Sequence, residues 1–253
     1  MYHAVGDELE IAGADPHYAV TIEKFEKQIR RIAKSEPIAA QFKRTGRITQ
    51  DCITFDDGHV SNYTVAFPAL KALGLGAEFY VNTATVGTDC YMSWEQLREL
   101  SIAGMSIQSH GHNHRYFSTL SESEIRDELR TSKHAIEAEL DQEVIIFAPP
   151  GGRYDSRVVS IAKQEGYECI ATSVPGVYRP PAQRNEMDFI QLPRFAVRSD
   201  TTAENILAWQ YQYSYATLAE SMRYQFYRLL KRLLGNRSYD NLRLRLLKKL
   251  KSR

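Results

Sequence analysis

The sequence predicts an α/β protein built on a parallel barrel, and three observations support this. Short apolar segments typical of buried strands alternate with segments of helical periodicity from about residue 1 to about residue 210. Seven strand-like segments separated by helices favour a parallel barrel over a β-sandwich. A basic, leucine-rich stretch at residues 211–253 then ends the alternation, so we expect a helical tail outside the barrel.

The first part of the barrel is expected to contain four strands, at residues 1–5, 53–57, 77–82 and 105–109. Thr21 is a suitable cap for the helix that follows it. A second helix is expected to begin at Ser61 and to be kinked or shortened by Pro68. Ser93 and Gln96 have capping-box spacing and predict the start of a third helix.

The second part of the barrel continues the same alternation. Strands are expected at residues 144–147, 169–172 and 192–197. A capping box at Ser121 predicts a long helix, and Asp155 is expected to begin another. Thr201 and Glu204 have the spacing of a further cap.

Length and composition indicate one barrel-sized globular domain. The chain has 253 residues, of which 43% are hydrophobic and 25% charged. It contains no apolar run of the ~20 residues that a membrane-spanning helix needs. Residues 1–8 do not resemble a secretory signal, and three widely spaced cysteines favour free thiols over disulfides. We therefore expect a cytoplasmic protein.

A small net charge conceals a basic tail. Residues 221–253 contain eleven Lys and Arg against the single Asp240, a net of +10, which leaves 21 basic and 30 acidic groups in residues 1–220. Apolar residues at helical spacing beside this charge are typical of a helix lying on anionic lipid at the inner face of a membrane. A helical pair packed on the barrel or on a partner is the alternative, and nucleic acid is not expected as a partner.

Two polar motifs directly follow predicted strands. Asp56 and Asp57 end one strand, and because neighbouring side chains on a strand diverge, one can bind a cation while the other accepts a proton. His110 and His114 follow another strand, and two histidines with one carboxylate bind zinc or a related metal while leaving positions open. The alternative interpretations are a solvated turn for the aspartates and surface polar residues for the histidines, although both motifs lie at the ends of apolar runs.

The order of three motifs resembles the polysaccharide deacetylases. These are metal-dependent carbohydrate esterases that remove N-acetyl groups from amino sugars. The motifs are Thr54-Phe55-Asp56-Asp57-Gly58, Ser109-His110 with His114, and Phe147-Ala148-Pro149-Pro150-Gly151-Gly152-Arg153-Tyr154-Asp155. The resemblance extends over about residues 1–198 and implies a distorted (β/α)7-type barrel.

The resemblance also implies roles for particular residues. Asp57, His110 and His114 would hold a divalent metal, Zn2+ first, with Co2+, Ni2+ or Mn2+ as alternatives, and Asp56 would be the catalytic base. His112 lies between the two histidine ligands and is not expected to bind the metal.

Two departures from the family pattern affect the expected mechanism. Ala148 occupies the position of an arginine that usually pairs with the base, and we expect Arg194 to replace it, with Arg198 in reserve. The family's usual late histidine, a general acid, is also missing, since no histidine follows position 134. A metal-bound water, protonated Asp56 or His3 would then protonate the leaving amine.

The third motif is expected to contact the substrate through Pro150, Gly151 and Tyr154, with a backbone N–H near Gly151 stabilising the oxyanion. A rigid turn explains the same prolines and glycines, and Tyr154 would also suit core packing. The expected substrate is an N-acetylated amino sugar in a polysaccharide, an oligosaccharide or a lipid-linked glycan of surface-polysaccharide synthesis. The alternatives are a catalytically impaired glycan-binding module and a hydrolase of another C–N bond, as in a cyclic ureide or imide.

Overall fold

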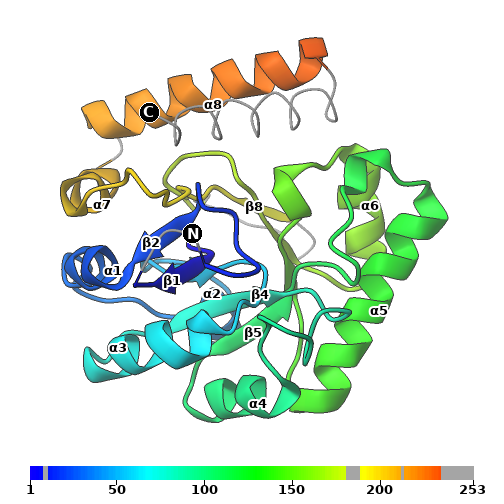
Figure 1. Cartoon of the computed structure of the whole chain (residues 1–253). Coiled ribbons are helices and arrows are strands. Elements are labelled where there is room, and N and C mark those ends of the chain that lie inside the picture. The colour runs from blue at the N-terminus through cyan, green and yellow to red at the C-terminus, as the bar shows by residue number, and fades with distance from the viewer. Residues whose placement is uncertain (8–10, 181–188, 212–213, 235–253) are drawn as a thin grey trace.

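A curled parallel sheet forms the centre of the molecule. The structure is a computed structural model that describes residues 1–7, 11–180, 189–211 and 214–234, with side chains described as far as residue 230. Six parallel strands lie side by side in sequence order, and helices surround them to give a (β/α)7-type half-barrel (Figure 1). The strands are β3 (Ile53–Phe55), β4 (Ala77–Val81), β5 (Ser106–Ser109), β6 (Ile146–Phe147), β7 (Cys169–Ala171) and β8 (Ile190–Leu192).

The start of the chain lies against β3. β1 (Ala4–Gly6) pairs in parallel with β2 (Ala19–Thr21), and Tyr2 forms a parallel bridge with Phe55. The Tyr2 backbone N–H donates to the carbonyl of Thr54 at 2.7 Å, and the Asp56 N–H donates to the carbonyl of Tyr2 at 2.9 Å. The opening strand predicted at residues 1–5 is therefore present, whereas β2 was not predicted.

The helices largely begin where the sequence predicted them. Side chains of Thr21, Ser93, Ser121 and Asp155 each cap a helix as expected. The helices are α1 (Ile22–Ile29), α2 (Ile38–Thr45), α3 (Phe67–Ala72), α4 (Trp94–Ile102), α5 (Glu122–Leu140), α6 (Ser156–Gln164), α7 (Ala203–Trp209) and α8 (Tyr215–Leu234).

The stretch after Ser61 is divided rather than continuous. A π-helical segment covers Asn62–Ala66, and α3 follows with Pro68 in its first turn. Proline is tolerated there because the first N–H groups of a helix have no partner within the helix. The predicted effect of this proline is therefore confirmed.

Three predicted boundaries or connections were wrong. The last strand covers Ile190–Leu192 rather than residues 192–197, because Pro193 lacks the N–H that would continue the ladder. The cap of α7 is Thr202, since the Thr201 hydroxyl instead accepts the N–H of Arg198. α2 occupies a segment that had been interpreted as a connection only.

Stacked aromatic rings in the core fix the end of β3. Phe55 stacks on Phe79 with ring centroids 4.9 Å apart and on Tyr2 at 5.5 Å, while Phe25 of α1 meets the Tyr2 ring edge-on. All four rings are buried, and burying each stabilises the fold by roughly 1.5–3 kcal/mol. Because Phe55 directly precedes Asp56, this packing positions the acidic residues at the rim of the sheet.

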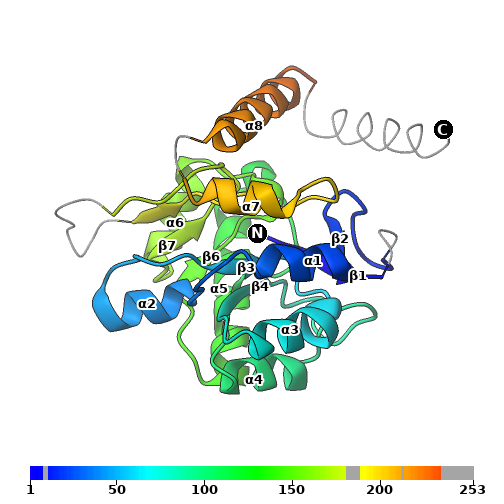
Figure 2. The same cartoon turned by 90° about the vertical axis from the view of Figure 1, so that its left-hand side faces the viewer.

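The C-terminal helix lies on the outside of the barrel. α7 lies between α1 and α8 in both views (Figure 2). Arg198 joins the barrel to Glu220 of α8 at 2.8 Å. No described helix is long and apolar enough to cross a bilayer. The second leucine-rich segment of the predicted tail, from residue 236, lies outside the described residues.

Candidate metal centre

The rim of the sheet brings two distant motifs together. Asp56 and Asp57 directly follow β3, and His110 directly follows β5. Both strands are parallel to β4 between them, so their carboxyl ends lie at the same edge of the sheet. His114 approaches from the loop after β5.

One carboxylate and two imidazoles converge at this edge. Oδ1 of Asp57 lies 3.2 Å from Nε2 of His110 and 3.2 Å from Nε2 of His114. One ligand atom from each residue lies within 4.8 Å of the others. The His110 side chain is buried, whereas those of Asp57 and His114 are 31% and 44% exposed, so a bound cation would retain contact with solvent. The donor set and its one-sided exposure fit a divalent metal with open coordination positions.

Electrostatics favour an anionic ligand at Asp57. Burial alone would raise the pKa of this carboxyl, but the hydrogen bonds from His110 and His114 outweigh burial and hold the pKa well below its ordinary value. The carboxylate is therefore ionised at neutral pH and can offset the charge of a cation.

His110 is oriented by the backbone of the third motif. Its Nδ1 lies 2.7 Å from the carbonyl oxygen of Ala148, which can only accept a hydrogen bond. Nδ1 therefore carries a proton, and Nε2, which faces Asp57, is the nitrogen left to bind a metal. A second hydrogen bond of this kind is what orients metal-binding histidines in proteins.

The backbone is strained at two of the three candidate ligands. Asp57 has φ = 73° and His114 has φ = 54°, a left-handed conformation that residues other than glycine rarely adopt. Such strain costs on the order of 1–3 kcal/mol per residue and persists only where the surroundings impose it. Its occurrence at two residues that share a carboxylate contact points to a functional constraint.

Asp56 has a separate environment from Asp57. Its two carboxylate oxygens accept hydrogen bonds from Arg194 at 2.7 and 3.0 Å, and both side chains are about 5% exposed. Arg194 also donates to the carbonyl of Thr172 and to the hydroxyl of Thr54. Burial would raise the pKa of Asp56, but the guanidinium of Arg194 outweighs burial and keeps that pKa below its usual value.

The pairing expected between Asp56 and Arg194 is thus present in the structure. The reserve candidate was wrong, because Arg198 lies on Glu220 of α8 at 2.8 Å. The role of Arg194 in turnover stays a prediction.

His3 lies close enough to Asp56 and Asp57 for their charges to affect its pKa. Burial lowers the pKa of His3, partly opposed by the carboxylates of Asp57 and Asp56. Its ring stacks on Tyr18 at 4.6 Å, and its buried Nδ1 has no hydrogen-bond partner among the described residues. A lowered pKa leaves His3 neutral at pH 7, so little of it carries a proton to donate there.

The three predicted substrate contacts have different settings. Pro150 is buried, and Gly151 has φ = 61° at a point where an added Cβ would lie 3.0 Å from the ring of Tyr116. Tyr116 follows His114 by two residues, so Gly151 belongs to the surroundings of the candidate metal set. Tyr154 instead donates its hydroxyl to Gln191 of β8 at 3.1 Å and packs partly against the core.

The sequence did not predict which residues hold the loop after β5, residues 110–114, in place. The side chains of Glu128 and Ser132, one turn apart on α5, contact residues 109–113 through hydrogen bonds. No local motif marks them, because helical spacing predicts only that this face of α5 points inwards. The three cysteines are free, as expected.

This chain forms a parallel half-barrel, and its candidate metal set lies at the carboxyl ends of the strands. It therefore has the architecture of the α/β barrels whose active sites lie at that edge. The sequence model of the polysaccharide deacetylase family matches residues 46–170. Residues 46–170 therefore form a polysaccharide deacetylase domain, and the resemblance of its motifs is confirmed.

Two curated proteins match about half of this chain. YxkH of Bacillus subtilis (strain 168), named as a polysaccharide deacetylase, is 32% identical over 124 residues, which are 49% of this chain and 44% of that protein. A peptidoglycan-N-acetylglucosamine deacetylase of Bacillus cereus is 30% identical over 122 residues, 48% of this chain and 55% of that protein. The match thus spans about half the length of these relatives.

Solved structures share the fold over a larger part of the chain. The Streptococcus pyogenes deacetylase PplD, solved with acetate, is 25% identical, with a TM-score of 0.69 over 82% of this chain and 94% of that chain. The Bacillus cereus polysaccharide deacetylase BC0361 also has a TM-score of 0.69 at 25% identity, covering 81% of this chain and 65% of that chain. The predicted barrel class is therefore confirmed.

Proposed function

We propose that this protein is a metal-dependent hydrolase that removes the acetyl group from an N-acetylated amino sugar in a glycan. The observation that supports this most strongly is the juxtaposition, at one edge of the sheet, of the Asp57–His110–His114 set and the buried Asp56–Arg194 pair. The polysaccharide deacetylase domain supports the same reaction class. Zinc is the proposed metal, since two imidazoles and a carboxylate suit it.

Asp57, His110 and His114 would hold the metal. A divalent ion there would polarise the acetyl carbonyl and make a water molecule more acidic. The protein's own contribution is to keep these donors ionised or correctly protonated and to leave one side open to the substrate. The buried side chain of His110 and the partly exposed side chain of His114 support both requirements.

Asp56 is the proposed base. It takes a proton from the attacking water, and Arg194 holds the carboxylate ionised in the correct orientation until then. When the C–N bond breaks, the same proton passes from Asp56 to the amine, so that acetate and the free amino sugar are released. This assignment avoids His3, whose lowered pKa leaves it mostly without the proton that a general acid would donate at neutral pH.

The proposed substrate follows from the chemistry of the site and from the relatives' names. One matching protein is named for peptidoglycan N-acetylglucosamine. Gly151, which lies against Tyr116 and has no side chain, would let a sugar approach the backbone, and Pro150 would fix the turn. The acetyl group is small, so the proposed reaction does not require a large hydrophobic pocket for the acyl group.

Acetate release tests this proposal. Metal-free protein would be incubated with N-acetylglucosamine oligomers while Zn2+, Co2+ or Ni2+ is added, with Asp56→Asn as the inactive comparison. Metal-dependent release by the natural chain, reduced by about 10²-fold or more in Asp56→Asn, is the expected result. Metal binding without acetate release from oligomers, peptidoglycan or a lipid-linked N-acetylated sugar would instead favour a glycan-binding module.

A second proposal concerns the location of the reaction. The apolar stripe of α8, defined here as Leu218, Met222, Phe226 and Leu229, has four side chains that are each more than half exposed. Exposed Arg228 lies on the same helix, and residues 221–253 carry a net charge of +10. We propose that this stripe rests on an anionic membrane surface, where a lipid-linked glycan would be a fitting substrate. The inner face of the cytoplasmic membrane is the proposed site.

A further inference from the structure

The loop that carries His114 holds this histidine beside Asp57 although the side chain is partly exposed. Residues 110–114 bend after β5, with φ = 81° at Gly111 and φ = 54° at His114. His110 is buried and oriented by Ala148, but the side chain of His114 is 44% exposed. Something other than burial must therefore hold His114 beside Asp57.

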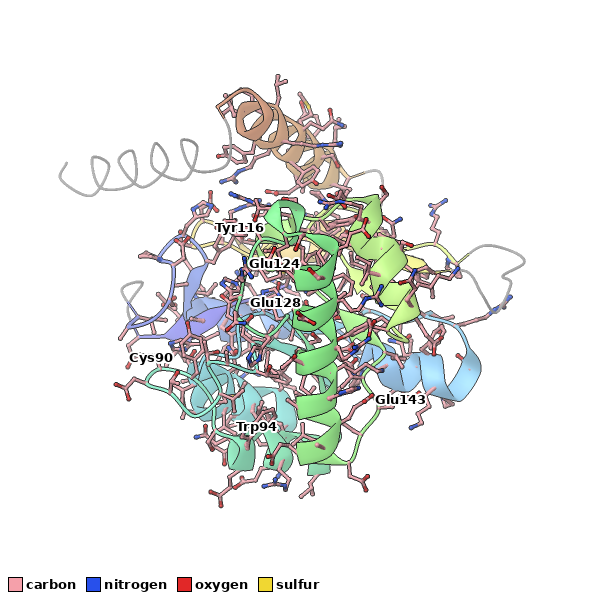
Figure 3. The ribbon with its side chains drawn as sticks, turned by 90° about the vertical axis from the view of Figure 1, so that its right-hand side faces the viewer. Cys90, Trp94, Tyr116, Glu124, Glu128 and Glu143 are labelled. Carbon is pink, nitrogen blue, oxygen red and sulfur yellow. The ribbon has the colours of Figure 1, made fainter. Side chains whose placement is uncertain are left out.

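Glu128 on α5 provides the hydrogen-bond acceptors for two backbone N–H groups of this loop. Its Oε2 accepts the backbone N–H groups of His112 and Asn113, each at 2.8 Å, and its Oε1 accepts the side-chain amide of Asn113 at 2.9 Å. Figure 3 shows Glu128 on α5, one turn from Glu124 and on the same side of the molecule as Tyr116.

The setting of Glu128 is unusual for a carboxylate. It is 4% exposed, and within the described part of the chain it forms no ion pair with Lys or Arg. Buried carboxylates are normally paired with a cation, so one whose hydrogen bonds all go to a single loop indicates a dedicated contact. An added Cβ on Gly111 would lie 3.4 Å from Oε2, which shows how closely the loop backbone packs against this side chain.

Thr83 and Ala84 also donate backbone N–H groups to the carbonyls of Gly111 and His112, but Glu128 accepts the loop's own N–H groups. We propose that Glu128 is a positioning residue of the candidate metal centre. It selects the loop conformation in which His114 meets Asp57, and it does so through hydrogen bonds rather than through its charge. The proposal rests on the proposed function for the identity of the ligand, but the loop contact itself does not depend on a metal. Outer groups of this kind typically contribute 10–100-fold to metal affinity.

Zinc titration of metal-free protein provides the first test. Glu128→Ala is expected to weaken Zn2+ binding 10–100-fold, and Glu128→Gln to stay within about threefold of the natural chain. Glutamine can still accept both backbone N–H groups, and the side-chain amide of Asn113 can rotate to present its oxygen. Equal weakening in Glu128→Gln and Glu128→Ala would show that charge, not hydrogen bonding, matters and would overturn the proposal. So would unchanged affinity in Glu128→Ala.

Glu137 provides the matched control on the same helix. Its carboxylate accepts the N–H of Val144 at 3.0 Å and pairs with Lys133, far along α5 from the loop. Glu137→Ala is expected to lower the melting temperature of the metal-free protein while leaving Zn2+ affinity within threefold. If both variants lose affinity equally, Glu128 acts only through general stability and the proposal fails.

Amide hydrogen exchange separates this proposal from the metal itself. In metal-free protein, the amides of His112 and Asn113 are expected to exchange at least tenfold faster in Glu128→Ala but not in Glu137→Ala. If the natural chain bound no Zn2+ and this difference still appeared, the proposed metal would be wrong and the loop contact would stand. Unchanged exchange in Glu128→Ala would overturn the loop contact.

Discussion

Two neighbouring aspartates have opposite surroundings. Asp57 faces two imidazoles with partial exposure, whereas Asp56 is buried against the guanidinium of Arg194. The abrupt end of an apolar strand was enough to predict that the two side chains would diverge. The left-handed backbone of Asp57 could not be predicted, because aspartate adopts this conformation only occasionally and nothing in the apolar strand pattern marks the position where it does.

Replacing Arg194 tests the environment of Asp56. Arg194→Ala removes the group that lowers the pKa of Asp56 and leaves the burial that raises it. We expect turnover to fall by about 10²-fold or more and the acid limb of the kcat/KM profile to move to higher pH, while metal remains bound. Kinetics of acetate release between pH 4 and pH 9 and a metal assay check this.

Arg198→Gln is the control for that experiment, since Arg198 pairs with Glu220 instead. Its pH profile should match that of the natural chain. Normal activity in Arg194→Ala would reject the assignment of Arg194.

Individual strands and helices show which secondary-structure predictions from the sequence were correct and which were not. Capping boxes at Ser93 and Ser121 identified helix starts because each cap requires particular residues at a fixed spacing. β2 has only three residues and leads directly into the cap of α1 at Thr21, so the sequence shows no strand separate from that helix start. The long-range contact between Arg194 and Asp56 was expected only from the family pattern, since 138 residues separate the partners.

β4 contains a buried carboxyl that gives a prediction for stability. Glu78 accepts the N–H of Ile38 at 2.8 Å, and burial raises its pKa to about 7 from the ordinary value of 4.5. Between these two pH values the unfolded chain releases the proton while the folded chain keeps it. The contribution of Glu78 therefore makes the protein less stable as pH rises from 4.5 to 7, and the full cost is present above 7.

Glu78→Gln should remove this cost. At pH 8 the variant is expected to gain up to on the order of 3 kcal/mol in free energy of unfolding relative to the natural chain, and little at pH 4.5. Urea unfolding followed by circular dichroism at both pH values measures the difference. A gain of equal size at both pH values would show that the cause is packing rather than ionisation.

The whole molecule combines a half-barrel with an external helix that has its own apolar stripe. The alternation of strands and helices predicted the barrel because each βαβ unit can bury its faces in few other ways. The sequence could not predict that α8 would be joined to the barrel by Arg198 and Glu220 while its apolar stripe faces outwards. Periodicity identifies an apolar face but not what covers it.

The outward stripe predicts binding to anionic lipid. The full chain should sediment with vesicles containing phosphatidylglycerol, bind pure phosphatidylcholine vesicles more weakly, and be partly released by 0.5 M salt. Leu218→Ser combined with Phe226→Ser should reduce binding on the order of tenfold or more, because two large apolar contacts are lost. Binding that ignores both lipid charge and these substitutions would contradict a role for the stripe.

The most direct test of the account is the stoichiometry of metal binding to the metal-free protein. Titration with Zn2+, or with Co2+ followed by its absorption spectrum, should show one tightly bound ion per chain. His110→Ala and His114→Ala should each abolish that site, whereas His112→Ala, whose ring contacts Thr83 instead, should retain it. Absence of a bound ion, or an ion that survives the loss of both His110 and His114, would contradict the central claim.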